Sequence, residues 1–213
     1  MIIVPALLTD NKETLIEMIR ISESFTDYVQ IDIMDGVFVP SKSITASDLR
    51  GIGTSLKMEA HLMVSSPHTY IDEFKEVGAF KVIFHFEATK EPEMVIERIR
   101  ESGLEVGLAI NPETQLQQVE DLLGKVDSLL FLSVNPGFYG AQFISEVLDK
   151  ARAFKTKRPS YKVEMDGGIK EENLSKIKSA GIDLACVGSA ILKAEDPKAV
   201  FLRLKKIAEN EDP

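Results

Sequence analysis

The sequence predicts an α/β protein that folds as a single closed (β/α)8 TIM barrel over residues 1–213. Eight short apolar runs, rich in β-branched residues, alternate along the chain with longer amphipathic segments. Such alternation implies parallel strands joined by right-handed crossovers. Eight units in 213 residues average roughly 27 residues each, which is compact but sufficient for a closed barrel.

Each strand is expected where one of the apolar runs occurs. The expected strands are residues 2–7, 28–33, 56–62, 80–86, 105–110, 128–132, 162–165 and 184–187. The expected helices are residues 12–24, 68–77, 93–102, 116–123, 144–155, 173–180 and 197–208, with a short helix near 46–51. Pro67, Pro92 and Pro197 stand where first helical turns would begin. An open doubly wound sheet is the rival fold, but no G-x-G-x-x-G motif follows the first strand.

The composition argues against a nucleic-acid-binding, membrane-binding or disulfide-bonded protein. Lys and Arg sum to 25 and Asp and Glu to 34, which gives a net charge of −9. An acidic chain is a poor nucleic-acid or anionic-membrane binder, so neither partner is expected. The one cysteine, Cys186, cannot form an internal disulfide, which suits a reducing compartment. No apolar run approaches the ~20 residues of a membrane helix, and the first residues lack a basic signal-peptide lead-in. A cytoplasmic protein is therefore expected.

Polar side chains gather at one end of the expected barrel. Side chains alternate between the interior and the helix layer along a strand. This alternation directs Gln30, Asp32, Glu59, His61, His85, Glu87, Glu164 and Asp166 inward. Taken singly, each has a structural explanation, because Asp-Gly pairs suit turns and lone histidines suit cores. Gathered at the carboxyl ends of strands, where barrel active sites lie, they indicate a site. Glu59 and Glu164, one layer deeper, are expected to be structural partners.

Glycines indicate what the site binds. Gly137 and Gly140 follow the sixth strand, Gly167 and Gly168 the seventh, and Gly188 with Ser189 the eighth. Loops after strands seven and eight commonly hold phosphate through backbone N–H groups and a helix N-terminus. The sequence therefore predicts a phosphorylated small molecule as ligand.

Seven segments then resemble the ribulose-phosphate 3-epimerase family, in the family's order and over essentially the whole chain. They are DIMDGVFVPS (32–41), HLMVSSPHTYIDEF (61–74), FHFEAT (84–89), LAINPET (108–114), VNPGFYGAQFI (134–144), MDGGI (165–169) and VGSAI (187–191). The resemblance implies an isomerase of the pentose phosphate pathway that interconverts D-ribulose 5-phosphate and D-xylulose 5-phosphate. It also implies a homo-oligomer.

Roles follow from the resemblance position by position. It makes Asp32 and Asp166 the two acid/base groups, one on each face of an enediolate formed at carbon 3. It makes His61, Gly137, Phe138, Gly140, Gly167, Gly168, Gly188 and Ser189 the substrate and phosphate contacts. It also implies a divalent metal (Zn, Fe, Mn or Co) held by Asp32, His61 and Asp166, with a Lewis-acid role.

The sequence departs from the family at the metal and substrate contacts. Gln30 replaces a ligand histidine, so metal binding is expected to be weakened or absent. Further departures are Ala6 for a serine, Val37 for a histidine, Ser41 for an asparagine, and Tyr139 and Ala141 in the sixth loop. Three hypotheses stay open: a pentulose-phosphate epimerase, a related barrel enzyme such as a hexulose 6-phosphate epimerase or a decarboxylase of a sugar-acid phosphate, and a non-catalytic phosphosugar-binding homologue.

Overall fold

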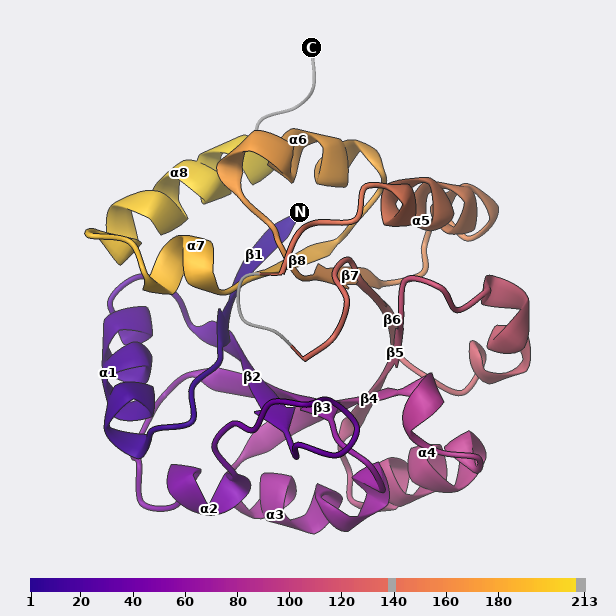
Figure 1. Ribbon diagram of the computed structural model, residues 1–213, viewed down its shortest axis with the longest axis horizontal. Helices are drawn as coiled ribbons and strands as arrows, with labels where there is room; N and C mark the ends of the chain where they lie inside the picture. Colours follow the sequence, from indigo (N-terminus) through magenta and orange to yellow (C-terminus); the bar gives the residue numbers. More distant parts are fainter. Residues whose placement is uncertain (138–140, 210–213) are drawn as a thin grey trace.

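The eight strands form one closed parallel barrel in the order of the sequence (Figure 1). The structure is a computed structural model that describes residues 1–137 and 141–209. The strands are β1 (Ile2–Leu7), β2 (Tyr28–Met34), β3 (Lys57–Met63), β4 (Ala79–His85), β5 (Glu105–Ile110), β6 (Ser128–Leu132), β7 (Val163–Asp166) and β8 (Leu184–Val187). Each lies within one residue of its expected bounds, so the predicted fold class is confirmed.

Helices surround the strands as an outer layer (Figure 1). They are α1 (Lys12–Glu23), α2 (Ala46–Leu49), α3 (Ile71–Glu76), α4 (Pro92–Glu101), α5 (Glu146–Lys157), α6 (Glu171–Ser179), α7 (Ser189–Leu192) and α8 (Pro197–Glu209). None of the helices in the described ranges is long and apolar enough to cross a membrane.

The helix expected over residues 116–123 is wrong. Four 3-10 turns occur in the described residues: η1 (Pro67–Thr69), η2 (Phe86–Ala88), η3 (Leu116–Gln118) and η4 (Glu120–Leu122). The last two replace the expected helix, and Val119 (φ −112°, ψ 0°) separates them. The Val119 N–H donates to the Leu116 carbonyl and the Leu122 N–H to the Val119 carbonyl, so each turn is closed by a bond across three residues, and the backbone at Val119 keeps the two turns from joining into one helix.

The alternation of side chains places the core on both sides of the strands. Outward side chains such as Val29, Ile31 and Ile33 pack with the helices in one large apolar cluster. Inside the barrel, small apolar clusters share the space with buried polar groups, including Gln30 and Glu59. The polar interior predicted from the strand pattern is therefore observed, and its upper layer opens toward the carboxyl ends of the strands.

Candidate active site

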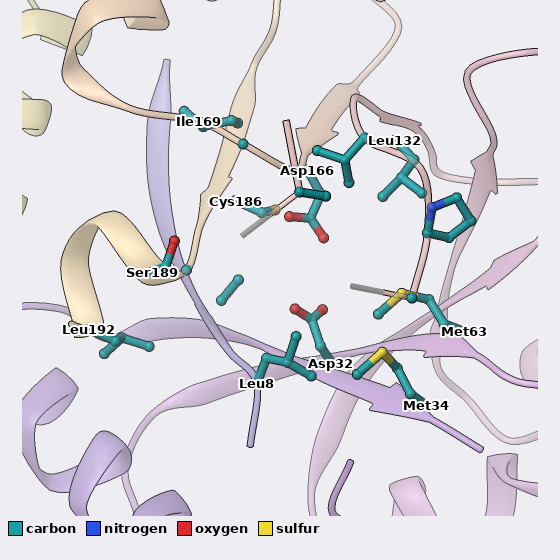
Figure 2. Close-up of a pocket in the computed structure, with 18 of the residues that line it drawn as sticks. Leu8, Asp32, Met34, Met63, Leu132, Asp166, Ile169, Cys186, Ser189 and Leu192 are labelled. Atoms are coloured by element: carbon teal, nitrogen blue, oxygen red, sulfur yellow. The ribbon is translucent and has the colours of Figure 1, made fainter. Parts of the chain in front are cut away.

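A cavity of about 220 Å³ lies at the carboxyl ends of the strands. Asp32 at the end of β2 and Asp166 at the end of β7 both line it, and their carboxylates point toward one another (Figure 2). Met34 and Met63 add apolar walls beside Asp32. The two strands are three apart around the ring, so the carboxylates enter the cavity from different sides.

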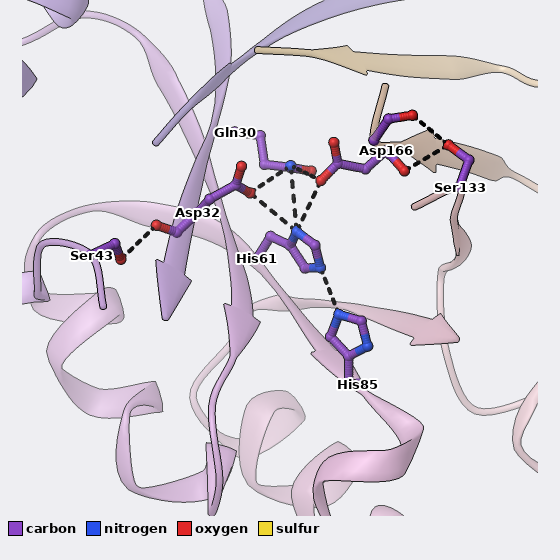
Figure 3. A network of polar contacts seen from close by, with 8 residues as sticks. Gln30, Asp32, Ser43, His61, His85, Ser133 and Asp166 are labelled. Atoms are coloured by element: carbon purple, nitrogen blue, oxygen red, sulfur yellow. Dashed lines mark hydrogen bonds and ion pairs between the residues drawn. The ribbon is translucent and has the colours of Figure 1, made fainter. Parts of the chain in front are cut away.

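Two serine hydroxyls hold the backbone on which the carboxylates stand (Figure 3). The Ser43 hydroxyl donates to the carbonyl oxygen of Asp32 at 2.9 Å. The Ser133 hydroxyl lies 2.8 Å from the carbonyl oxygen of Asp166 and 2.7 Å from that of Gly167. Because both serines lie in loops outside β2 and β7, these bonds fix the backbone at each aspartate.

His61 and Gln30 lie between the two carboxylates (Figure 3). The Nδ1 atom of His61 is 3.1 Å from Asp32 Oδ1 and 3.2 Å from Asp166 Oδ2. The Gln30 amide nitrogen donates to the same two oxygen atoms at 2.8 Å and 2.9 Å. The carboxylates and the imidazole each offer a ligand atom to one small volume, so Asp32, His61 and Asp166 could hold a metal ion.

Burial and mutual charge shift the pKa values of this cluster. Burial, together with the charge of Asp166, raises the pKa of Asp32 to about 6. Burial lowers the pKa of His61, but its hydrogen bonds to Asp166 and Asp32 outweigh this and raise it to about 10. A carboxyl that titrates near neutral pH can exist in both protonated and ionised forms, which acid/base catalysis requires.

Tyr28, Glu59, Lys81 and Glu164 form a second polar layer deeper in the barrel, which we call the inner layer. The Lys81 ammonium lies 3.0 Å from Glu59 Oε2 and also contacts Glu164 Oε1. The Tyr28 hydroxyl donates to Glu59 Oε2 at 2.5 Å. None of these four residues lines the cavity. The interpretation of Glu59 and Glu164 as structural partners fits this geometry.

The glycine-rich loops lie against the same cavity. Gly137, Gly167, Gly168, Gly188 and Ser189 all line it. Gly167 has a φ of +107°, and a Cβ there would approach Val134 Cγ2 to 2.6 Å, so only glycine fits. The predicted contacts Phe138 and Gly140, and the Tyr139 departure, lie outside the described residues.

The sequence reasoning missed several cavity residues. Lys170 and Lys193 line the cavity, as do Leu8 and Met18. Lys170 follows the DGGI segment directly and Lys193 ends the short helix after Gly188, so proximity to the glycine motifs was the available signal. Ala6 and Ala141 also line the cavity, whereas Val37 is an exposed loop residue.

Comparison with known proteins identifies close relatives in sequence. A model described as "Ribulose-phosphate 3 epimerase family" matches residues 2–192. A protein named ribulose-phosphate 3-epimerase from Mycobacterium tuberculosis is 37% identical over 188 residues, covering 85% of this chain and 82% of the relative. Proteins of the same name from Aquifex aeolicus and Escherichia coli are 38% and 35% identical, covering 85% and 82% of this chain and 84% and 81% of their own lengths.

Solved structures of other enzymes share the fold. A 3-hexulose-6-phosphate synthase from Salmonella typhimurium superimposes with a TM-score of 0.73 at 17% identity and covers 98% of both chains. An orotidine 5'-phosphate decarboxylase from Pyrococcus horikoshii gives a TM-score of 0.70 at 14% identity, covering 99% of this chain and 100% of its own. At these identities the likeness shows the barrel fold alone.

Proposed function

Because the chain belongs to the ribulose-phosphate 3-epimerase family, we propose that it interconverts D-ribulose 5-phosphate and D-xylulose 5-phosphate by moving a proton at carbon 3. The observation that carries this proposal is the pair of facing carboxylates, Asp32 and Asp166, in one cavity. The expected single catalytic domain, the homo-oligomer and the cytoplasmic location stay predictions.

The chemistry requires two acid/base groups on opposite faces of the substrate. The C–H bond to be broken lies next to a ketone, so its loss gives a planar enediolate. One carboxylate removes the proton from carbon 3, and the other, in its protonated form, delivers a proton to the opposite face. Asp32 and Asp166 enter from strands three apart, and the raised pKa of Asp32 favours a state with one shared proton.

The phosphate end of the substrate is assigned to the glycine loops. Gly167 and Gly168 follow β7, and Gly188 stands directly before α7, whose first residue is Ser189. Backbone N–H groups in such loops bind phosphate oxygens without a side chain in the way. Anchoring the phosphate there would leave carbon 3 between the carboxylates, with the sixth-strand loop at Gly137 closing one side of the cavity.

Solvent deuterium tests the reaction directly. The protein is incubated with D-ribulose 5-phosphate in deuterated buffer, and recovered pentulose phosphates are examined by NMR. We expect deuterium at carbon 3 and the appearance of D-xylulose 5-phosphate, since both proton steps exchange with solvent. Recovery of unlabelled D-ribulose 5-phosphate, with metal added or not, would contradict the epimerase, and binding of the sugar phosphate by that same protein would then favour the non-catalytic homologue. Faster labelling of a six-carbon ketose phosphate would favour the hexulose alternative.

The residues around His61 fit a divalent metal ion. Gln30 Nε2, Asp32 Oδ1, His61 Nδ1 and Asp166 Oδ2 lie 2.8 to 3.5 Å apart in the five measured pairs. Ligands of a tetrahedral site with ~2.0 Å bonds are separated by about 3.3 Å. Asp32, His61 and Asp166 would hold the ion. When bound, it supplies Lewis-acid stabilisation of negative charge on the substrate oxygens.

Gln30 determines which metal ions this site would prefer. Its amide nitrogen faces the carboxylates, while its Oε1 atom is buried without a hydrogen-bond partner among the described residues. A half-turn of the amide exchanges the two atoms and would offer Oε1 as a fourth ligand. A set of three oxygen ligands and one nitrogen ligand favours Mg²⁺ or Mn²⁺ over Zn²⁺. We therefore propose weak binding of Zn²⁺, Fe²⁺ and Co²⁺.

Gln30→His is expected to tighten Co²⁺ and Zn²⁺ binding by roughly tenfold or more, because imidazole suits these ions better than an amide. Calorimetric titration of the metal-free protein with Co²⁺ measures the change. Gln30→Met, which offers neither an imidazole nor an amide, is the matched control and should not tighten binding. Stoichiometric zinc in the purified wild type, with an affinity equal to that of Gln30→His, would contradict the weak site.

A further inference from the structure

A line of buried polar groups leads from His61 away from the carboxylates. The Nε2 atom of His61 lies 2.9 Å from Nε2 of His85 (Figure 3). The two rings are fully buried and stack with centroids 5.1 Å apart. His85 ends β4, one strand beyond the β3 strand that carries His61. The proposed metal ligand is therefore held by a second histidine, and neither ring is among the residues that line the cavity.

The far side of His85 faces Glu87. Its Nδ1 atom lies 3.4 Å from Glu87 Oε2, a polar contact longer than a good hydrogen bond, and neither atom has a hydrogen-bond partner within the described parts of the chain. The turn η2 directs Glu87 back over the end of β4. Its other oxygen, Oε1, accepts from the Asn111 N–H at 2.9 Å and from the Thr114 hydroxyl at 2.5 Å. Glu87 is thus anchored to the loop after β5.

These contacts fix the direction of the hydrogen bonds. A carboxylate oxygen can only accept, so the His85 nitrogen that faces Glu87 must carry the proton. With its one proton on Nδ1, neutral His85 accepts at Nε2. His61 must then donate through its Nε2–H. Its Nδ1 faces carboxylate oxygens of Asp32 and Asp166 at 3.1 Å and 3.2 Å, so in the metal-free protein Nδ1 carries a proton as well, and a bound metal would take the place of that proton. The reverse direction would face an imidazole lone pair with a carboxylate lone pair, and burying two acceptors together is costly.

We propose that His85 and Glu87 are positioning residues that hold the His61 ring with Nδ1 toward Asp32 and Asp166. The proposal rests on the proposed role of His61 at the reacting cavity. Partners that orient a ligand histidine through its other nitrogen are worth about 10- to 100-fold in metal affinity or activity. Phe38, whose ring centroid lies 5.2 Å from that of His85, packs against the same ring and limits its rotation.

The His85 tautomer provides a first test. The chain has three histidines, and His68 lies on the surface side of η1, so the ring signals in a long-range ¹H–¹⁵N spectrum can be assigned by substitution. We expect His85 to be neutral and protonated on Nδ1, with an acceptor-type Nε2. Protonation of His85 on Nε2 would overturn the proposal. This measurement needs neither metal nor sugar phosphate, so its outcome is independent of the proposed reaction.

Cobalt binding provides the second test. His85→Leu removes the hydrogen bond to His61 and the polar contact with Glu87. It is expected to weaken Co²⁺ binding about 10- to 100-fold, whereas His85→Gln, which can both accept and donate, should restore most of it. Ile83→Val, two residues earlier on the same inward face of β4, controls for loss of packing alone. Equal losses of Co²⁺ affinity in His85→Leu, His85→Gln and Ile83→Val would mean that His85 contributes only through packing.

Glu87→Gln provides a third test, and the single variant can be measured even if His85→Leu does not fold. This variant retains the shape of Glu87, so its contacts with Asn111 and Thr114 can persist while the charge on the acceptor is lost. We expect a smaller loss of Co²⁺ affinity, and almost none when Glu87→Gln is added to His85→Leu, since both act through one chain of bonds. Full additivity of the two effects would contradict the proposal that Glu87 acts on His61 through His85. If the wild-type protein binds cobalt but does not epimerise the sugar phosphate, the proposed function is overturned, while the positioning role of His85 and Glu87 stands.

Discussion

Replacing either Asp32 or Asp166 by asparagine is expected to lower kcat by at least about 10²-fold, because each variant lacks one of the two groups that exchange the proton at carbon 3. Asparagine keeps the shape of the side chain and can still hydrogen-bond to Gln30 or His61, so the fold should persist. Initial rates from D-ribulose 5-phosphate and from D-xylulose 5-phosphate measure the effect. Activity near that of the wild type in either variant would contradict the two-base scheme.

Isotope exchange shows whether Asp32→Asn and Asp166→Asn lose activity because a catalytic base is missing or because a metal ligand is missing. In a two-base site, each carboxylate removes the proton from only one of the two epimers. Asp32→Asn should therefore still exchange the carbon 3 hydrogen of one epimer with solvent, without inversion, and Asp166→Asn that of the other. Loss of metal affects the deprotonation of both epimers alike. If both variants fail to exchange the carbon 3 hydrogen of the same epimer, the two carboxylates do not act on opposite faces of the substrate.

Asp35→Asn is the matched control for these substitutions. Asp35 directly follows β2 at the same end of the barrel, but its carboxylate accepts from the N–H groups of Val37, Phe38 and Ser65. Although it is partly buried, these bonds hold its pKa below the ordinary range, and it does not line the cavity. We expect its substitution to change the rate by less than about tenfold, since no proton transfer depends on it.

The period of the strand pattern explains why much of the site could be predicted. Alternation along a strand depends only on local sequence, and it is enough to direct Asp32, His61 and Asp166 inward. The contacts between these residues could not be predicted in the same way. Gln30 stands out in the sequence as a departure at a metal ligand, yet its donation to both carboxylates depends on the registers that join β2 through β1 and β8 to β7 and on the curvature of the ring.

Lys81 shows most clearly where local pattern fails. It lies in an apolar run that predicts a strand, and nothing nearby in sequence indicates a partner for its charge. Its partners Glu59 and Glu164 are 22 and 83 residues away, on β3 and β7. Gly107 on β5 leaves the space that its side chain crosses, since a Cβ there would lie 3.1 Å from Lys81 Cε and 2.6 Å from Ile83 Cγ1.

Lys81→Met is expected to lower the free energy of unfolding by about 3–5 kcal/mol, because it leaves two buried carboxyl groups without their cation. Methionine preserves most of the length of the side chain, so the loss reflects charge more than volume. Urea denaturation measures the change. Glu59→Gln is the matched control: it leaves one lysine paired with one carboxylate and should cost much less. Adding Glu59→Gln to Lys81→Met should recover part of the loss.

The cost of Lys81→Met is also expected to grow as the pH rises from about 7 to about 9. Burial and the charge of Glu164 raise the folded-state pKa of Glu59 from 4.5 to about 7, while Lys81 lowers it. A carboxyl with a raised folded-state pKa stabilises the fold fully below its unfolded pKa, and this contribution disappears as the pH rises through the folded value. Without Lys81 the pKa of Glu59 rises further, so ionisation above neutral pH opposes folding more strongly in the variant. An unfolding free-energy difference that stays constant across this range would mean that Lys81 contributes only through the packing of its aliphatic stem.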